Sequence, residues 1–136
     1  MGQQQLLLLV FGIIVAATAV VSGIVAFQEK MRQSEMEHII DRNLKIASAA
    51  AFWKTKRDPF AGGNASYAGL ATGGMARLNM EVSTHHATYE ITSATGSQLV
   101  VTGVSTRYTE IGARTYVTHY DVDSTIVSFT GEYTID

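Results

Sequence analysis

Hydrophobic and polar residues follow three successive patterns along this chain. The first is an apolar run at residues 6–27, 22 residues without a charged side chain, after a polar start with three glutamines. As a helix the run would be about 33 Å long, close to the roughly 30 Å hydrocarbon thickness of a bilayer. A cleaved secretory signal normally has a basic start and a shorter apolar core of about 7–15 residues. The run therefore predicts a helix that is kept in the finished protein and is long enough to cross a membrane.

The second pattern, at residues 28–57, repeats with a helical period and contains neither glycine nor proline. Asp58-Pro59 then disfavours further helix, because proline restricts the residue before it. Nothing earlier forces a break, so we expect one continuous helix of roughly 50 residues and about 75–80 Å. Its first half, residues 1–27, is apolar all round, and its second half, residues 28–57, is amphipathic. The expected apolar face of the second half comprises Met36, Ile39, Ile40, Ala47, Ala50, Ala51 and Lys54.

The third pattern has a period of two and begins after a glycine-rich loop, residues 58–76. Apolar Leu78, Met80 and Val82 alternate with polar residues, and similar alternation recurs at residues 87–92 and 127–133. Turn signals at residues 95–97, 111–112 and 121–123 separate these segments. We therefore expect residues 77–136 to form an antiparallel sheet of four to five strands with one apolar face. Only the amphipathic helix half can cover that face, so the predicted fold class is α+β, a long N-terminal helix packed on a C-terminal sheet.

Small residues in the apolar run lie in one register. Their spacings of 4, 3, 4 and 3 place them on a single side of a helix, where backbones can approach one another closely. Each glycine costs about 1 kcal/mol of helix propensity relative to alanine, so its presence indicates a gain either from close packing or from a local opening of the helix. This register predicts helix–helix association between identical chains. The packing seam, extended towards the N-terminus, comprises Gln5, Leu9, Gly12, Ala16, Ala19, Gly23 and Ala26.

Charge and cysteine content exclude several classes of function. The formal net charge of −2 is too small for binding of a polyanion, so no nucleic-acid partner is expected. Residues 1–28 carry no charged side chain, residues 29–58 carry seven basic and five acidic side chains, and the remainder is mildly acidic. The chain has no cysteine, which excludes disulfides, thiolate metal sites and cysteine nucleophiles. A protein without disulfides that works outside the cell must gain stability from packing or from neighbouring subunits.

No residue pattern predicts a catalytic, cofactor or metal site. Adjacent His85 and His86 would point to opposite faces of a strand, so they are interpreted as structural or solvent-exposed, as is His119. The acidic residues of the sheet region are scattered, with nothing that marks a paired acid and base. We therefore expect that the protein is not an enzyme and needs no cofactor. Asn64-Ala65-Ser66 fits the glycosylation acceptor pattern, which makes Asn64 a candidate modification site.

The order of these segments resembles the type IV pilins and their pilin-like relatives. The resemblance is carried by "QQQLLLLVFGIIVAATAVVSGIVAF" as the apolar helix half and "QEKMRQSEMEHIIDRNLKIASAAAFW" as the amphipathic half. The glycine-rich loop and the strands after Leu78 match the family in outline. The resemblance implies a structural subunit of an extracellular filament, in which apolar helix halves leave the membrane and pack in a central bundle. It also implies a homo-oligomer, dependence on a pilus assembly machinery, and residence in the cytoplasmic membrane before assembly.

The chain departs from the family pattern at several positions. In the family a glutamate at the fifth mature position neutralises a neighbouring N-terminal amine. Here the fifth residue from Met1 is the uncharged Gln5, and it would be Leu7 if Gly2 were the processing glycine. Ser22-Gly23 stands where the family has a helix-breaking proline, and the paired cysteines are absent.

Two other interpretations of the sequence are open. One is a single-span membrane-anchored protein, either an accessory pseudopilin or a partner-binding β-domain. Lys30, Arg32, Arg42 and Lys45 follow the apolar run, and the positive-inside rule alone would place the sheet in the cytoplasm. The other interpretation is a secreted binding domain with a cleaved signal, or a small enzyme.

Overall fold

The computed structural model describes residues 2–57 and 62–135, and it divides into two units, Met1–Gln33 and Ser34–Asp136. Helix α1, Gly2–Thr55, is 54 residues long and contributes to both units. The predicted continuous helix is therefore confirmed. Gly12 and Gly23 lie inside it without breaking it, because a single glycine costs only about 1 kcal/mol in a helix interior.

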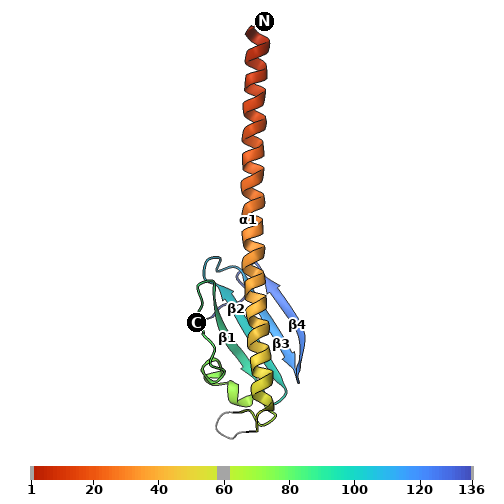
Figure 1. Cartoon of the computed structure of the whole chain (residues 1–136), viewed down its shortest axis with the longest axis vertical. Coiled ribbons are helices and arrows are strands. Elements are labelled where there is room, and N and C mark those ends of the chain that lie inside the picture. The colour runs from red at the N-terminus through yellow and green to blue at the C-terminus, as the bar shows by residue number, and fades with distance from the viewer. Residues whose placement is uncertain (1, 58–61, 136) are drawn as a thin grey trace. The chain divides into compact units, whose positions relative to one another are not determined.

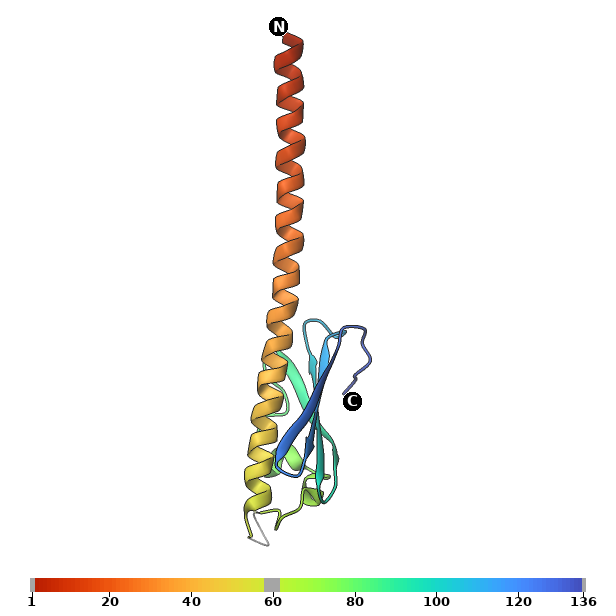
Figure 2. The ribbon, with the colours of Figure 1, turned by 90° about the vertical axis from the view of Figure 1, so that its right-hand side faces the viewer.

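The second unit is an antiparallel sheet with the end of α1 on one face (Figures 1 and 2). Its strands follow one another in the order β1-β2-β3-β4, and each pairs antiparallel with the next. The predicted α+β fold is confirmed, with four strands. Their bounds are β1 Ala87–Ala94, β2 Gln98–Ser105, β3 Gly112–Thr118 and β4 Asp121–Ser128.

The core of this unit lies between α1 and the sheet. On the helix, Ile39, Ile46 and Ala50 are fully buried. The helical periodicity predicted this for Ile39 and Ala50. Gly103 of β2 brings the two layers together, because a Cβ at this position would lie 2.8 Å from Cγ2 of Ile39. Asn43 adds a polar link: its side-chain Nδ2 donates to the Ala113 carbonyl of β3, at 3.1 Å. The remaining large buried core residues are Trp53, Tyr67, Leu70, Met75, Tyr89, Leu99, Val101, Ile111 and Val117.

The strand expected around Leu78–Val82 is wrong. The loop after α1 contains the 3-10 helix η1, Ala68–Leu70, and the short helix α2, Gly74–Arg77, and Leu78 is the C-cap of α2. Asn79 then adopts a left-handed conformation with φ 56°, and the Met80 amide donates back to the Met75 carbonyl at 2.9 Å. This is a helix-terminating motif in which asparagine takes the place of glycine. Capping of α2 therefore overrides the alternating pattern.

The expected turn at residues 121–123 is also wrong, because β4 begins at Asp121 and the turn lies at His119 and Tyr120. His119 has φ 58°, and its carbonyl accepts hydrogen bonds from Lys54 Nζ and the Tyr67 hydroxyl. These tertiary bonds hold the turn two residues before the position that the aspartates indicate. The expected turn at residues 95–97 is confirmed, since β1 ends at Ala94 and β2 begins at Gln98.

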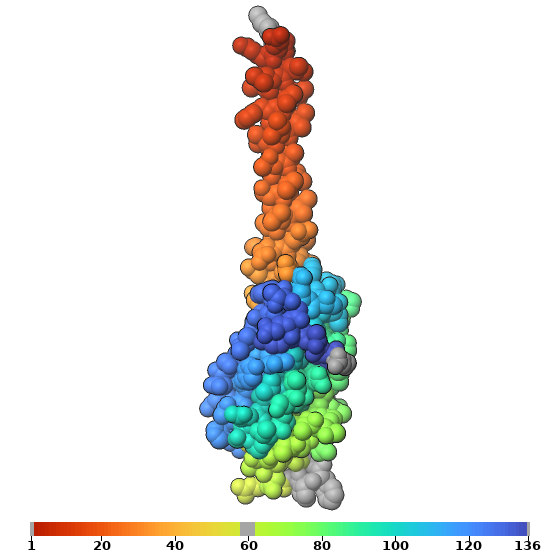
Figure 3. Space-filling model, turned by 180° about the vertical axis from the view of Figure 1, so that it is seen from behind, coloured from red at the N-terminus to blue at the C-terminus, as the bar shows by residue number. Residues whose placement is uncertain are grey.

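The last strand ends earlier than the alternation at residues 127–133 predicts. β4 ends at Ser128, and the following residues run over the sheet face seen in Figure 3. Tyr133 is buried beside Gly112 of β3, with the Arg114 guanidinium 4.5 Å from its ring centre. Ile135 lies near Thr88 of β1, where both residues line a small cavity. The segment therefore covers part of the sheet face that α1 leaves open.

Candidate functional site

The first unit is an apolar helix surface that nothing in the described chain covers. Between Leu6 and Phe27, 14 large hydrophobic side chains are 47–70% exposed. The most apolar 18-residue window of α1 has a mean hydropathy of 2.7, and none of it is buried. By length and composition this helix could cross a membrane. Such a surface cannot stay in water, so lipid or another protein must cover it.

Every residue of the predicted packing seam lies in this exposed unit. A Cβ at Gly12 or at Gly23 would meet no atom within 4 Å outside the local helix. Packing within the described chain therefore does not explain either glycine. The hydroxyl of Thr18 donates to the Ile14 carbonyl at 2.8 Å, so this polar group is satisfied within the helix. The association of seams between chains stays a prediction.

The two edges of the sheet are protected against pairing with another strand. Outside β1, the Tyr89 amide donates to the Val82 carbonyl at 2.7 Å, and Ser83 forms an isolated bridge with Thr88. At the opposite edge, Asp123 is the extra residue of an irregularity, because Tyr116 pairs with Ser124 and Val117 with Val122. Bulges and exposed charges are common ways to block edge-to-edge association. The sheet edges are therefore poor candidates for an assembly surface.

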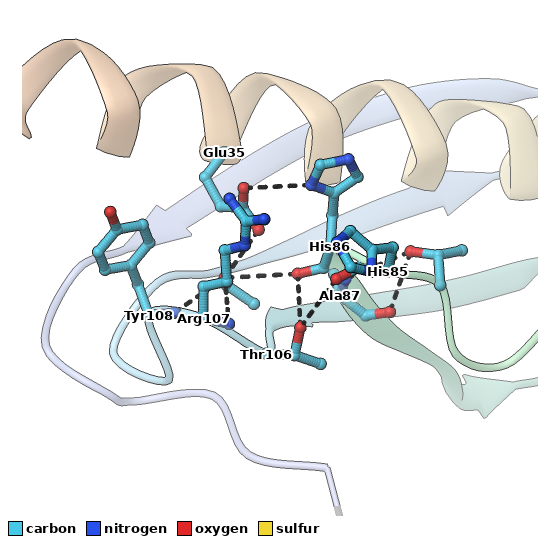
Figure 4. Close-up of polar contacts among 9 residues, drawn as sticks. Glu35, His85, His86, Ala87, Thr106, Arg107 and Tyr108 are labelled. Atoms are coloured by element: carbon cyan, nitrogen blue, oxygen red, sulfur yellow. Dashed lines mark hydrogen bonds and ion pairs between the residues drawn. The ribbon is translucent and has the colours of Figure 1, made fainter.

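A cluster of polar contacts surrounds Glu35 of α1 in the second unit (Figure 4). The glutamate is 5% exposed, and its carboxylate points from the helix towards the end of β2. Oε1 accepts a hydrogen bond from the Ser105 hydroxyl at 3.0 Å, and Oε2 lies 3.5 Å from Nδ1 of His86. The second distance suits an ion pair when the imidazole is protonated, but it is too long for a good hydrogen bond. A buried carboxylate with these partners ties α1 to the sheet.

Ser105 transmits this link to the loop between β2 and β3. Its oxygen accepts hydrogen bonds from the amides of Arg107 and Tyr108, at 3.2 and 3.1 Å. The side chain is thus bonded on both sides and is only 2% exposed. The group that accepts the serine proton in this hydrogen bond is the Glu35 carboxylate, whereas the His86 imidazole lies against that carboxylate and not against the serine. This arrangement connects α1, the end of β2 and the loop that follows it.

Three histidines gather at the outer side of this cluster. The rings of His38 and His86 stack with centroids 4.8 Å apart and planes within 8°, and His85 meets His86 edge-on. His85 and His86 precede β1, so the expected strand positions for this pair are wrong. Stacked rings do not direct their nitrogen atoms at one point, as a metal requires. Within residues 2–57 and 62–135, no three histidine, aspartate or glutamate side chains are placed to hold a metal ion.

A second buried charge, Lys54, fixes the turn between β3 and β4. It is 3% exposed, and its ammonium group lies 4.4 Å from the ring centre of Tyr67 and 4.5 Å from that of Tyr120. Such cation–π contacts offset part of the loss of hydration. Burial and, secondly, the neighbouring Tyr120 raise the pKa of the Tyr67 hydroxyl above its ordinary value. Lys54 was expected on the sheet-facing side of the helix, and its burial agrees with that.

Asn64, the candidate glycosylation site, is exposed in a turn after α1. Its backbone has φ 50°, a left-handed conformation that asparagine tolerates better than most residues. The side chain is accessible, and its modification stays a prediction.

Comparison with models of known protein families, with curated proteins and with solved structures found no match to this chain.

The sequence analysis did not identify Glu35 as a buried residue at the helix–sheet contact. It placed Lys54 on the sheet-facing side of the helix but did not predict its role there. Glu35 falls four residues before Ile39 and eight before Asn43, so helical spacing alone could have placed it on the buried face. No sequence signal identifies Ser105 and His86 as its partners, because they lie 70 and 51 positions away. Only the fold brings these three residues together.

Proposed function

We propose that this chain is the structural subunit of an extracellular filament of the type IV pilus kind. It polymerises through its N-terminal apolar helices, with the sheet unit displayed on the outside. The observation that carries this proposal is the exposed helix of residues 2–33, in which Gly12 and Gly23 of the seam face open space. Close packing against neighbouring helices would give these glycines a purpose, whereas lipid alone would not.

Before assembly, the apolar helix would lie in the cytoplasmic membrane as a single span. A helix there has most of its side chains solvated by acyl chains, so transfer into a bundle gains little from the hydrophobic effect. Contact between small residues then supplies the attraction, because close backbones increase dispersion contacts. A pilus assembly machinery would be needed to extract the span and to place the sheet unit outside.

The protected sheet edges support growth through the helix. A filament that grew by strand pairing would need at least one free edge on each subunit. Here residues 82–83 bond along part of β1, and β4 carries Asp121 and Asp123 beside an irregularity. These features support growth through the helix and not through the sheet edges.

Gln5 would have a modest part in assembly. Its amide can donate and accept hydrogen bonds but cannot neutralise an amine. Gln5→Ala should therefore weaken assembly by the net value of one hydrogen bond, about 0.5–1.5 kcal/mol. The measurement is the protein concentration at which filaments first sediment. A complete loss of filaments in this variant would show that Gln5 has a larger role.

Negative-stain microscopy of the native material tests the proposed function most simply. Thin filaments of uniform diameter, dissociating into this chain in detergent, are the expected result. Single molecules in the membrane, or chains that lack the apolar segment, would contradict it.

The alternative function is a single-span membrane anchor for a partner-binding β-domain. It is favoured by the length and hydropathy of the α1 window, which suit a bilayer. An anchor of this kind tolerates a bulky apolar residue anywhere on its lipid-facing surface. The two functions therefore predict different results for substitutions in the seam.

A further inference from the structure

The face of α1 that the sheet leaves uncovered is the starting point for a second interface. Between residues 34 and 55 the buried positions, among them Glu35, Ile39, Ile46, Ala50 and Trp53, lie against the sheet. The opposite side of the same helix segment is exposed to solvent. Its exposed residues include Glu37, Asp41, Leu44, Lys45, Ser48 and Phe52.

Two apolar side chains stand out on this outer face. Phe52 is 65% exposed and Leu44 is 37% exposed, eight residues apart on one stripe of the helix. Phe52 is more exposed than any other large hydrophobic side chain described between residues 34 and 135. Burial of such a side chain in a contact gains roughly 1.5–3 kcal/mol.

The two ends of the outer face carry charges of opposite sign, with Lys45 between them. Glu37 and Asp41 lie towards its N-terminal part, whereas the exposed Lys56 follows its last turn. Asp41 is bonded to Lys45 of its own helix at 2.9 Å, but both side chains remain more than 60% exposed. Lys56 lies over the ring of Phe52, 5.1 Å from its centre. Glu37 at one end of this face and Lys56 at the other are therefore complementary in charge.

We propose that the C-terminal end of this outer face, with Phe52 and Lys56, binds the N-terminal end of the outer face, with Glu37 and Asp41, of a second copy of the same chain displaced along the helix axis. The inference rests on the proposed filament, in which all helices run in one direction. A shift of 15–19 residues, about 23–29 Å, would bring Lys56 of one copy to Asp41 or Glu37 of the next. Phe52 would then be buried beside the same contact.

Such a contact is heterologous, because one end of the face meets the other end in the next copy. Contacts of this kind repeat and produce open helical assemblies, whereas isologous contacts close at two copies. The charge pattern would therefore set the axial shift between subunits. The small-residue seam would supply attraction without fixing that shift.

Charge reversal and its compensation test this inference on the full-length chain. Filaments are grown by dilution of detergent at low ionic strength, and the threshold concentration is read from sedimentation. Glu37→Lys and Lys56→Glu should each raise the threshold about three- to tenfold, as an exposed attraction becomes a repulsion. The double variant, which has the native net charge, should return to within about twofold of the native threshold, because the pair is restored.

Glu90→Lys is the matched control, since it makes the same charge change at an exposed position of β1. It should leave the threshold within about twofold of the native value, because Glu90 lies on β1 and not on the outer face of α1. Phe52→Ala should raise the threshold without changing the fold of the dissociated chain, as judged by circular dichroism.

The outcomes separate this inference from the proposed function. Absence of filaments from the native chain would contradict the proposed function itself. Native filaments whose threshold is unchanged by both single reversals, or whose double variant is as poor as the singles, would overturn the outer-face contact alone. Charge reversals that change the formation of a dimer but not of filaments would also overturn it.

Discussion

Glu35 shows how one residue can fix the position of a helix on a sheet. Its carboxylate is buried and receives a hydrogen bond from Ser105, while His86 lies within ion-pair distance. A buried charge is tolerated only when polar partners replace the lost water. The residue therefore specifies which turn of α1 faces the end of β2.

Glu35→Ala should lower the free energy of unfolding of the second unit by about 1–3 kcal/mol, because buried polar partners lose their acceptor. Glu35→Gln should cost less, since an amide oxygen can still accept from Ser105. Glu37→Ala, an exposed change of the same type two residues away, should stay within about 0.5 kcal/mol. Thermal unfolding of the full-length chain in detergent measures all three. Equal effects of the Glu35 and Glu37 changes would contradict the assigned role of Glu35.

Tyr67 makes the second unit sensitive to alkali. Burial raises the pKa of its hydroxyl, and the nearby Tyr120 adds to the shift. A hydroxyl with a raised pKa in the folded state keeps its proton to a higher pH than it does in the unfolded chain. Stability is therefore fully present below the ordinary tyrosine value of 10.0 and falls as the pH rises through the higher folded value.

Tyr67→Phe should make this alkaline loss of stability shallower. At neutral pH the variant should lose about 0.5–1.5 kcal/mol, because the hydrogen bond to the His119 carbonyl is gone. The measurement is the free energy of unfolding between pH 7 and pH 11. If the free energy of unfolding of the native chain and of the variant fell in parallel as the pH rose, Tyr67 would not titrate as described.

At the scale of elements, the contact between α1 and β2 depends on the absence of a side chain at Gly103. An added Cβ would lie 2.8 Å from Ile39 and from Tyr89, inside van der Waals distance. The helix would have to move away from the sheet, or both side chains would have to change rotamer. Close packing therefore sets the separation of the two layers.

Gly103→Ala should destabilise the second unit by about 1–3 kcal/mol, the usual cost of overpacking a core. Gly96→Ala provides the comparison, because an added Cβ there meets only the Ser66 hydroxyl, at 3.9 Å. That variant should remain within about 0.5 kcal/mol of the native chain. The two unfolding curves, recorded in the same detergent, decide the matter. A Gly103 variant as stable as the Gly96 variant would mean that the layers adapt freely.

The elements themselves were largely predictable, because long periodic segments carry strong signals. Continuous hydrophobicity and the lack of breakers predicted α1, and alternation predicted β1, whereas β4 begins inside the expected turn at residues 121–123 and ends before most of the alternation at residues 127–133. The errors fall where tertiary contacts compete with local pattern. Asn79 caps α2 in place of a strand, and the bonds from Lys54 and Tyr67 to His119 shift the last turn.

At the scale of the whole molecule, the sequence could indicate the exposed apolar helix but not the polar cluster around Glu35. An apolar run can be recognised from neighbouring residues alone. Its exposure can also be predicted, because the sequence offers no other segment large enough to cover it. The Glu35 cluster joins residues about 70 positions apart, and no spacing rule connects them. Long-range polar contacts of this kind become visible only in the fold.

The central claim is that the apolar helix ends against identical helices and not against lipid. Ala19→Leu, on the seam, and Ala17→Leu, roughly 160° away around the same helix, make it testable with one change of side chain at two positions. Sedimentable filament from each variant is the measurement. The account predicts that Ala19→Leu abolishes filaments, while Ala17→Leu assembles near the native level. Equal filament yields from the two variants, or equal loss, would contradict it.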